Sequence, residues 1–158
     1  MAEFTYNPVQ TVQPNQAALL NDSIRCPKGY VIHRNESGLV TLRGVVNNPC
    51  GCSARYQVTA NGNIAVPPDG TVGPIAVALA IDGEPIQTSR AIVTPAAVSE
   101  AAPSIANYFN VTSTAIIDVR SGCCVQVSLE NVSPGATSAD PAPAIDIQNL
   151  NVTVTRIA

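Results

Sequence analysis

Charges are scarce in this sequence of 158 residues, and so are the side chains that most often carry chemistry. Charged residues make up 12% of the chain, tryptophan is absent, and His33 is the only histidine. Lys28 is the only lysine and the arginines are scattered singly, so no basic stripe exists that could neutralise a phosphate backbone. We therefore expect no binding to nucleic acid. A surface with so few charges favours association with other subunits.

Long apolar runs are also missing. None approaches the roughly 20 residues that a membrane-spanning helix needs, so we expect no association with a membrane. The first residues, Met1 to Tyr6, have neither the basic start nor the apolar stretch of a secretory signal peptide. We expect the protein to be made in a cytoplasm, and either to stay there or to leave by another route such as lysis.

A complete set of paired cysteines is lacking as well, because the chain has five cysteines. An odd number, in a chain long enough to bury its own core, argues against a disulfide framework. Four thiols could hold zinc, but zinc-binding cysteines are usually separated by roughly two to four residues. Here the candidates are Cys50 and Cys52, separated by one residue, and the adjacent Cys123 and Cys124. We expect free, at least partly buried thiols, no metal site and no other cofactor.

Short alternating or β-branched segments are abundant. Hydrophobic residues make up 46% of the chain, and 13 prolines and 10 glycines help to delimit the segments. No long helical pattern occurs anywhere. We expect extended segments at residues 4–12, 18–24, 30–33, 39–43, 55–59, 63–66, 75–81, 84–94, 108–112, 115–119, 123–129 and 145–157.

Three local signals are more specific. Asp82 and Gly83 lie between two strand-like segments, and both central residues of a type I′ hairpin turn need the positive φ that Asp and Gly tolerate. Residues 145–157 alternate, but the apolar phase switches near Asn149, which predicts a bulge or kink. The Asn-Gly pair at 61–62 predicts a break between the segments on either side of it.

Many short strands in one domain predict an all-β fold, an antiparallel jelly-roll sandwich of about eight to ten strands. A parallel α/β fold is excluded, because its crossover helices have no sequence to form them. The strand number and the missing tryptophan disfavour a seven-stranded immunoglobulin sandwich. The length fits one domain. We divide the chain into an extended N-terminal segment, residues 1–15, and a single jelly-roll domain, residues 16–158.

No residue set suited to catalysis is recognisable. His33 lies in an alternating segment, and no nucleophile-elbow sequence accompanies it. The acids occur singly, and the nearest pair, Asp82 and Glu84, is explained by the chemistry of the hairpin turn. A jelly-roll oxygenase of the cupin type would need two or three metal-binding histidines. We therefore expect that the protein is not an enzyme.

Several motifs occur in order along most of the chain: YVIHR (30–34), TLRG (41–44), ARYQVT (54–59), NIAVP (63–67), GPIAVALAIDGEP (73–85), IVTPAAV (92–98), YFNV (108–111), GCC (122–124) and LNVTV (150–154). Together they resemble a group of small virion-associated proteins of tailed phages of gut Firmicutes. More loosely, the pattern resembles the tumour-necrosis-factor/complement-type jelly roll of bacterial spore surfaces and phage fibres. That resemblance implies a homotrimer whose aromatic inner faces pack around the axis.

The resemblance also implies a role. The protein would be a bacteriophage virion structural protein, a trimeric capsid decoration or head-fibre subunit. It would be made in the host bacterial cytoplasm, be located in the virion, and have phage capsid proteins as partners. The alternative is a host- or glycan-binding module of a phage tail fibre or of a bacterial or spore surface. Exposed aromatic residues on loops would favour that alternative, but the loops are rich in proline, alanine, serine and glycine.

Two groups of residues are candidates for contacts with other chains. We assign Tyr56, Tyr108 and Phe109 to the subunit interface, with core packing and a sugar-binding platform as alternatives. The polar N-terminal segment also carries four apolar or aromatic residues with little reason to be there unless they pack on something. They either anchor the protein to the capsid or belong to the first edge strand of its own sandwich, and they are Phe4, Tyr6, Val9 and Val12.

Overall fold

The computed structural model describes residues 1–25, 29–45, 53–68, 70, 72–95, 108–135, 137 and 140–158. In this part of the chain the backbone forms twelve strands, arranged in two sheets of six. A single turn of 3-10 helix, η1 (Gln87–Ser89), accompanies them. None of the described residues forms a helix long and apolar enough to cross a membrane.

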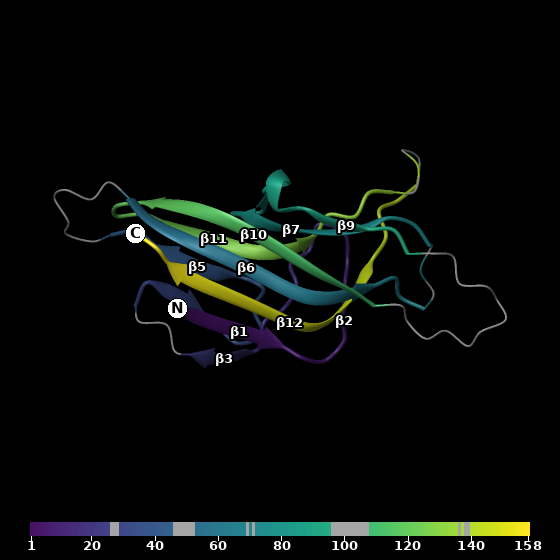
Figure 1. Cartoon of the computed structure of the whole chain (residues 1–158), viewed down its shortest axis with the longest axis horizontal. Helices are drawn as coiled ribbons and strands as arrows, with labels where there is room; N and C mark the ends of the chain where they lie inside the picture. Colours follow the sequence, from purple (N-terminus) through teal and green to yellow (C-terminus); the bar gives the residue numbers. More distant parts are fainter. Residues whose placement is uncertain are drawn as a thin grey trace.

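The first sheet, called sheet A here, contains the three longest strands. In spatial order it consists of β10 (Phe109–Arg120), β6 (Ser53–Ala65), β12 (Ile145–Arg156), β1 (Ala2–Tyr6) and β3 (Asp22–Arg25), and β2 (Gln10–Val12) pairs with the beginning of β12. Figure 1 shows β10, β6 and β12 running side by side along the length of the molecule. Both termini lie at the same end as the β10–β11 turn (Figure 1).

The second sheet, sheet B, has shorter strands. Its order is β4 (Val31–His33), β5 (Val40–Arg43), β11 (Cys124–Asn131), β7 (Ile75–Ile81) and β8 (Glu84–Pro85), and β9 (Ala91–Val93) pairs with the beginning of β7. All pairings in both sheets are antiparallel, for example β11 with β5 and β10 with β6. The all-β antiparallel architecture expected from the sequence is confirmed. Twelve strands replace the expected eight to ten because several edge segments of two or three residues also pair.

The core lies between the two sheets. On β6 the side chains of Ala54, Tyr56 and Val58 are buried, whereas those between them face outward, as the period of two requires. Strand β7 differs, since its outward-facing alanines are buried as well as its core-facing residues. The largest side chains without exposed surface are Phe4, Leu42, Tyr56, Ile64, Ile75, Leu79, Ile145 and Ile147.

The turn and the bulge expected from the sequence are both present. Asp82 and Gly83 have φ values of 51° and 84°, which confirms the type I′ geometry of the β7–β8 turn. Asn149 has φ 53°, and the pairing of β12 with β6 shifts register between Gln148 and Asn151. The phase switch in the sequence therefore marks a real bulge, which keeps apolar residues on both sides of Asn149 directed into the core.

The break expected at residues 61–62 is wrong. Strand β6 continues through Asn61 and Gly62, because β10 pairs with it along one edge and β12 along the other. The Asn61 side chain is also held, since its amide donates to the Thr112 hydroxyl at 2.7 Å. Pairing on both edges thus outweighs the local turn preference of Asn-Gly.

The N-terminal segment is part of the sandwich, which corrects the division at residue 15. Strand β1 lies inside sheet A, with β12 on one side and β3 on the other, and β2 also pairs with β12. Phe4 has no exposed surface and Val12 is 3% exposed. Of the two readings left open for this segment, the structure has a strand of the protein's own sandwich, although β1 is an inner strand and not the edge strand that was expected.

Candidate subunit interface

The structure places Tyr56 in the core, so its assignment to the subunit interface is wrong. The side chain is fully buried between the sheets, and its hydroxyl donates to the carbonyl oxygen of Arg43 at 2.6 Å. Burial raises the pKa of the Tyr56 phenol, with the nearby Arg156 opposing that effect. An aromatic residue with a satisfied hydroxyl is a structural link between sheet A and sheet B, with no surface left for a second chain.

Tyr108 and Phe109 lie far from Tyr56. Phe109 pairs with Ile64 and Tyr56 pairs with Ile117, so the two aromatic residues are at opposite ends of β6, roughly 26 Å apart along the strand. Tyr108 and Phe109 are half-buried, and burial, followed by the charge of Asp146, raises the pKa of Tyr108. The three aromatic residues therefore form no common cluster, and a place for Tyr108 and Phe109 in an interface stays a prediction.

The residues proposed as a capsid anchor are mostly unavailable for that role. Phe4 and Val12 are buried in the core and Tyr6 is half-buried against it, so they serve the protein's own sandwich. The Phe4 ring packs against the His33 ring, with ring centroids 4.7 Å apart. Val9, which is 47% exposed between β1 and β2, is the one of the four that remains open to a partner.

The outer face of sheet A is a broad surface made by β10, β6 and β12, and we refer to it as the assembly face. Alternation places every second residue of these strands outward, and the three strands align them in rows. Most of these side chains are uncharged and polar. The uncharged polar ones are Gln57, Thr59, Asn61 and Asn63 of β6, Asn110, Thr112 and Thr114 of β10, and Asn151, Thr153 and Thr155 of β12. The apolar Ile116 and the charged Arg55, Asp118 and Arg120 also face outward on these strands.

Many of these polar side chains bond to each other across the strands. The Asn61 amide donates to the Asn110 carbonyl at 3.2 Å, and the Asn110 amide donates in turn to Asn63 at 3.1 Å. The Thr114 hydroxyl donates to that of Thr59 at 3.2 Å. The face is thus already ordered in the single chain, so packing against a second chain would cost less side-chain entropy.

Two exposed isoleucines interrupt this polar surface at one end. Ile116 on β10 is 63% exposed, and Ile157, which follows β12, is 47% exposed. The Ile157 N–H donates to the Arg55 carbonyl, so Ile157 lies opposite Arg55. Ile116 lies opposite Gln57, two residues further along β6. Neither isoleucine was identified as a surface residue from the sequence. The period of two in residues 109–120 was the available signal, because it places Ile116 on the same face as Asn110, Thr112 and Thr114.

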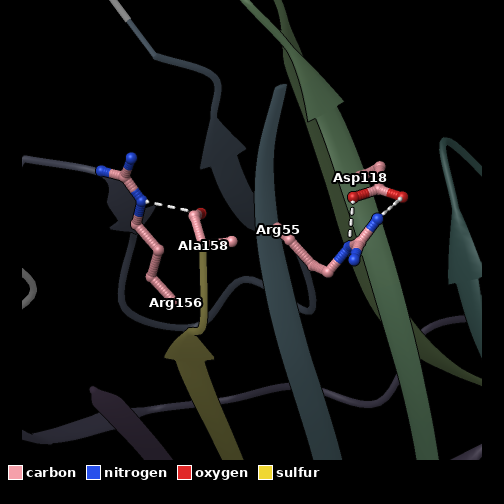
Figure 2. Close-up of polar contacts among 4 residues, drawn as sticks. All are labelled: Arg55, Asp118, Arg156 and Ala158. Atoms are coloured by element: carbon pink, nitrogen blue, oxygen red, sulfur yellow. Dashed lines mark hydrogen bonds and ion pairs between the residues drawn. The ribbon is translucent and has the colours of Figure 1, made fainter. Parts of the chain in front are cut away.

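An ion pair bounds the assembly face at that same end. The Arg55 Nε donates to one Asp118 oxygen at 2.8 Å and its Nη2 to the other at 3.3 Å, in a forked arrangement between β6 and β10 (Figure 2). On the other side of Arg55, the Arg156 Nε donates to the Ala158 carbonyl (Figure 2). The hydrogen bond from Arg55 lowers the pKa of Asp118, and the same bond raises that of Arg55.

This pair gives a prediction about pH. We expect the Asp118 carboxyl, followed by NMR, to titrate below its ordinary range, and the Arg55→Gln variant to restore the ordinary value. A lowered folded-state pKa stabilises the fold at pH above the ordinary value, and that contribution is lost as the pH falls through the lowered pKa. Both side chains are half exposed, so we expect the loss to be small. An unchanged titration midpoint in the Arg55→Gln variant would contradict the assignment.

The remaining candidates for chemistry lie apart from the assembly face. Cys123 and Cys124 are free and exposed, which corrects the expectation of partial burial, while Cys26, Cys50 and Cys52 lie outside the described residues. The His33 Nε2 lies 2.9 Å from the Ser37 carbonyl oxygen. The described residues contain no group of three or more His, Cys, Asp or Glu side chains arranged to hold a metal ion.

Comparison with known proteins identifies the fold. No family model matches the sequence, and no curated protein matches it. Among solved structures, the globular domain of the zebrafish complement 1qA protein is similar to this chain with a TM-score of 0.51 and 13% sequence identity. The similarity covers 96% of this chain and 94% of that domain. At this identity it shows the fold alone, which is a jelly-roll sandwich of the C1q and tumour-necrosis-factor type.

Proposed function

We propose that this protein is a non-enzymatic structural subunit that forms a homotrimer through the assembly face, and that the trimer decorates a bacteriophage capsid. One observation carries the proposal: the central part of the assembly face is uncharged and polar, its side chains are already hydrogen-bonded to one another, and the exposed Ile116 and Ile157 lie at one end of it. Uncharged polar groups cost less to dehydrate than charges do. An exposed isoleucine beside them supplies apolar area that only a partner can bury.

The number of subunits and the capsid come from the sequence resemblance. The tumour-necrosis-factor/complement-type pattern implies a trimer, and the motifs from residues 30–34 to 150–154 imply a virion. The proposed axis differs from the aromatic one that the sequence suggested, because Tyr56 is buried in the core. The low fraction of charged residues, 12%, agrees with a subunit that covers much of its surface in an assembly.

The interface has a direct test in two matched variants. Ile116→Asp places a charge on the assembly face, whereas Ile92→Asp places one on β9 of sheet B, where the isoleucine is 53% exposed. We expect Ile116→Asp to raise the dissociation constant of the trimer by more than about 30-fold, as for a residue that contributes at least about 2 kcal/mol to an interface. Light scattering should show a smaller mass for Ile116→Asp and an unchanged mass for Ile92→Asp.

The role on the capsid needs a second readout. Wild-type protein should co-sediment with purified capsids and not with host cells, and the Ile116→Asp variant should bind capsids more weakly because it loses multivalent attachment. If both variants stay trimeric, the assembly face is wrong. If the wild-type trimer binds host cells and leaves capsids bare, the capsid role is wrong even though the interface stands.

A further inference from the structure

A groove lies on the outer face of sheet B, on the side of the sandwich away from the assembly face. Its cavity volume is about 380 Å³, within the range of roughly 300–1,000 Å³ that is usual for small-molecule sites. Strands β4, β5 and β11 and the turn between β4 and β5 provide its lining. The lining residues are Ile32, Arg34, Ser37, Leu39, Thr41 and Gln126.

The lining combines aliphatic surface with polar groups that lack partners. Ile32 and Leu39 are 43% and 40% exposed. Within the described residues, the Arg34 guanidinium, the Thr41 hydroxyl and the Gln126 side-chain amide make no hydrogen bond or ion pair, in contrast to the bonded polar groups of the assembly face. The groove therefore offers a ligand the positively charged Arg34 donors, together with the Thr41 hydroxyl and the Gln126 amide, which can each donate and accept hydrogen bonds.

The turn that carries Arg34 is held in place by the rest of the fold. The Leu20 N–H donates to the Ser37 carbonyl at 3.2 Å, and the Glu36 N–H donates to the Leu20 carbonyl at 3.1 Å. The Ser37 N–H also donates to the Arg34 carbonyl, and the Ser37 hydroxyl accepts the Leu39 N–H. A ligand would thus meet a preformed backbone and would mainly order exposed side chains.

Charge is unevenly distributed along the groove. Arg34 follows the edge strand β4, whereas Asp82 lies beyond β11, where its carboxylate accepts the Gln126 backbone N–H at 2.8 Å. In the strand order β4-β5-β11-β7 these positions are three strands apart, or about 14 Å. An anionic group is therefore favoured beside the Arg34 guanidinium and disfavoured near Asp82 and near Glu36, which is exposed in the same turn as Arg34.

We propose that this groove binds a saccharide bearing one carboxylate, such as a uronic or sialic acid. A single guanidinium suits one carboxylate, with which it can form a forked pair, and does not suit a polyphosphate. Thr41 and Gln126 are able both to donate to and to accept from ligand hydroxyls. Ile32 and Leu39 present apolar surface to the C–H face of a sugar ring. The lining residues include no aromatic side chain on which a nucleotide base could stack.

The test is an NMR titration of the full-length protein at constant ionic strength. The probes are glucuronic acid and N-acetylneuraminic acid, with glucose as the neutral sugar and acetate as the bare carboxylate. We expect saturable shifts at the Ile32, Thr41 and Gln126 amides with both acidic sugars. Binding should weaken at least about tenfold, which corresponds to about 1.4 kcal/mol, in the Arg34→Gln variant and with glucose.

The matched control is Arg43→Gln. Arg43 is exposed on β5, but it does not line the groove, so its loss should leave the affinity within about twofold. Three outcomes would overturn the proposal: no saturable shift up to about 50 mM ligand, equal binding of acetate and the acidic sugars, or equal losses in the two arginine variants. The same titration of Ile116→Asp separates this site from the trimer, because the groove should bind equally well whether or not that variant assembles.

Discussion

Deletion of residues 1–15 is expected to abolish folding. The deletion removes β1 from between β12 and β3 and removes β2 from the beginning of β12. It also removes Phe4, whose side chain is fully buried and whose loss alone would cost about 3–5 kcal/mol. A domain is stable by only about 5–15 kcal/mol, so the truncated chain should be insoluble, or unfolded by circular dichroism.

Substitutions within the segment show whether burial is the cause. Phe4→Ala should lower the free energy of unfolding by about 3–5 kcal/mol, whereas Val9→Ala, at a position that is 47% exposed, should change it by less than about 0.5 kcal/mol. A soluble, folded truncated protein that no longer binds capsids would contradict this account and restore the anchor.

Tyr56→Ala is the point substitution with the largest expected effect on the core. The side chain is fully buried between the sheets and donates to the Arg43 carbonyl at 2.6 Å. Replacing a buried ring of this size by alanine costs about 3–5 kcal/mol, so urea unfolding should show a loss of that size. Because Tyr56 lies in no interface, any trimer formed by the folded fraction should dissociate no more readily than the wild type.

Tyr56→Phe separates the ring from its hydroxyl. It keeps the packing and leaves the Arg43 carbonyl without its donor, so we expect a smaller loss of about 1–3 kcal/mol. If Tyr56→Ala leaves the unfolding free energy unchanged and instead dissociates an oligomer, the residue belongs to an interface and its place in the core is wrong.

The local features that were predictable from sequence depend on backbone constraints within a few residues. The Asp82–Gly83 turn needs two positive φ values, and the phase switch at Asn149 needs a bulge, so each is visible in a short stretch of sequence. The fold class followed from the same period-two pattern repeated along the chain. These inferences required no knowledge of which strands pair.

The features that were missed depend on pairing between distant segments. Asn61–Gly62 lies inside a strand because both residues pair with β10 and Asn61 also pairs with β12. Tyr56 is buried because it lies on the face of β6 that meets the other sheet, where the Arg43 carbonyl accepts its hydroxyl. The assembly face and the groove each combine residues from three strands, and alternation alone cannot tell which of the two faces of a strand meets a second sheet.

Sedimentation equilibrium of the wild-type protein at micromolar concentration tests the central claim most directly. The account predicts a single species of about 49 kDa, three times the 16.3 kDa of one chain. It also predicts a smaller mass for the Ile116→Asp variant and an unchanged mass for the Ile92→Asp variant. A wild-type protein that sediments at the mass of one chain throughout this range would contradict the proposed trimer and its assembly face.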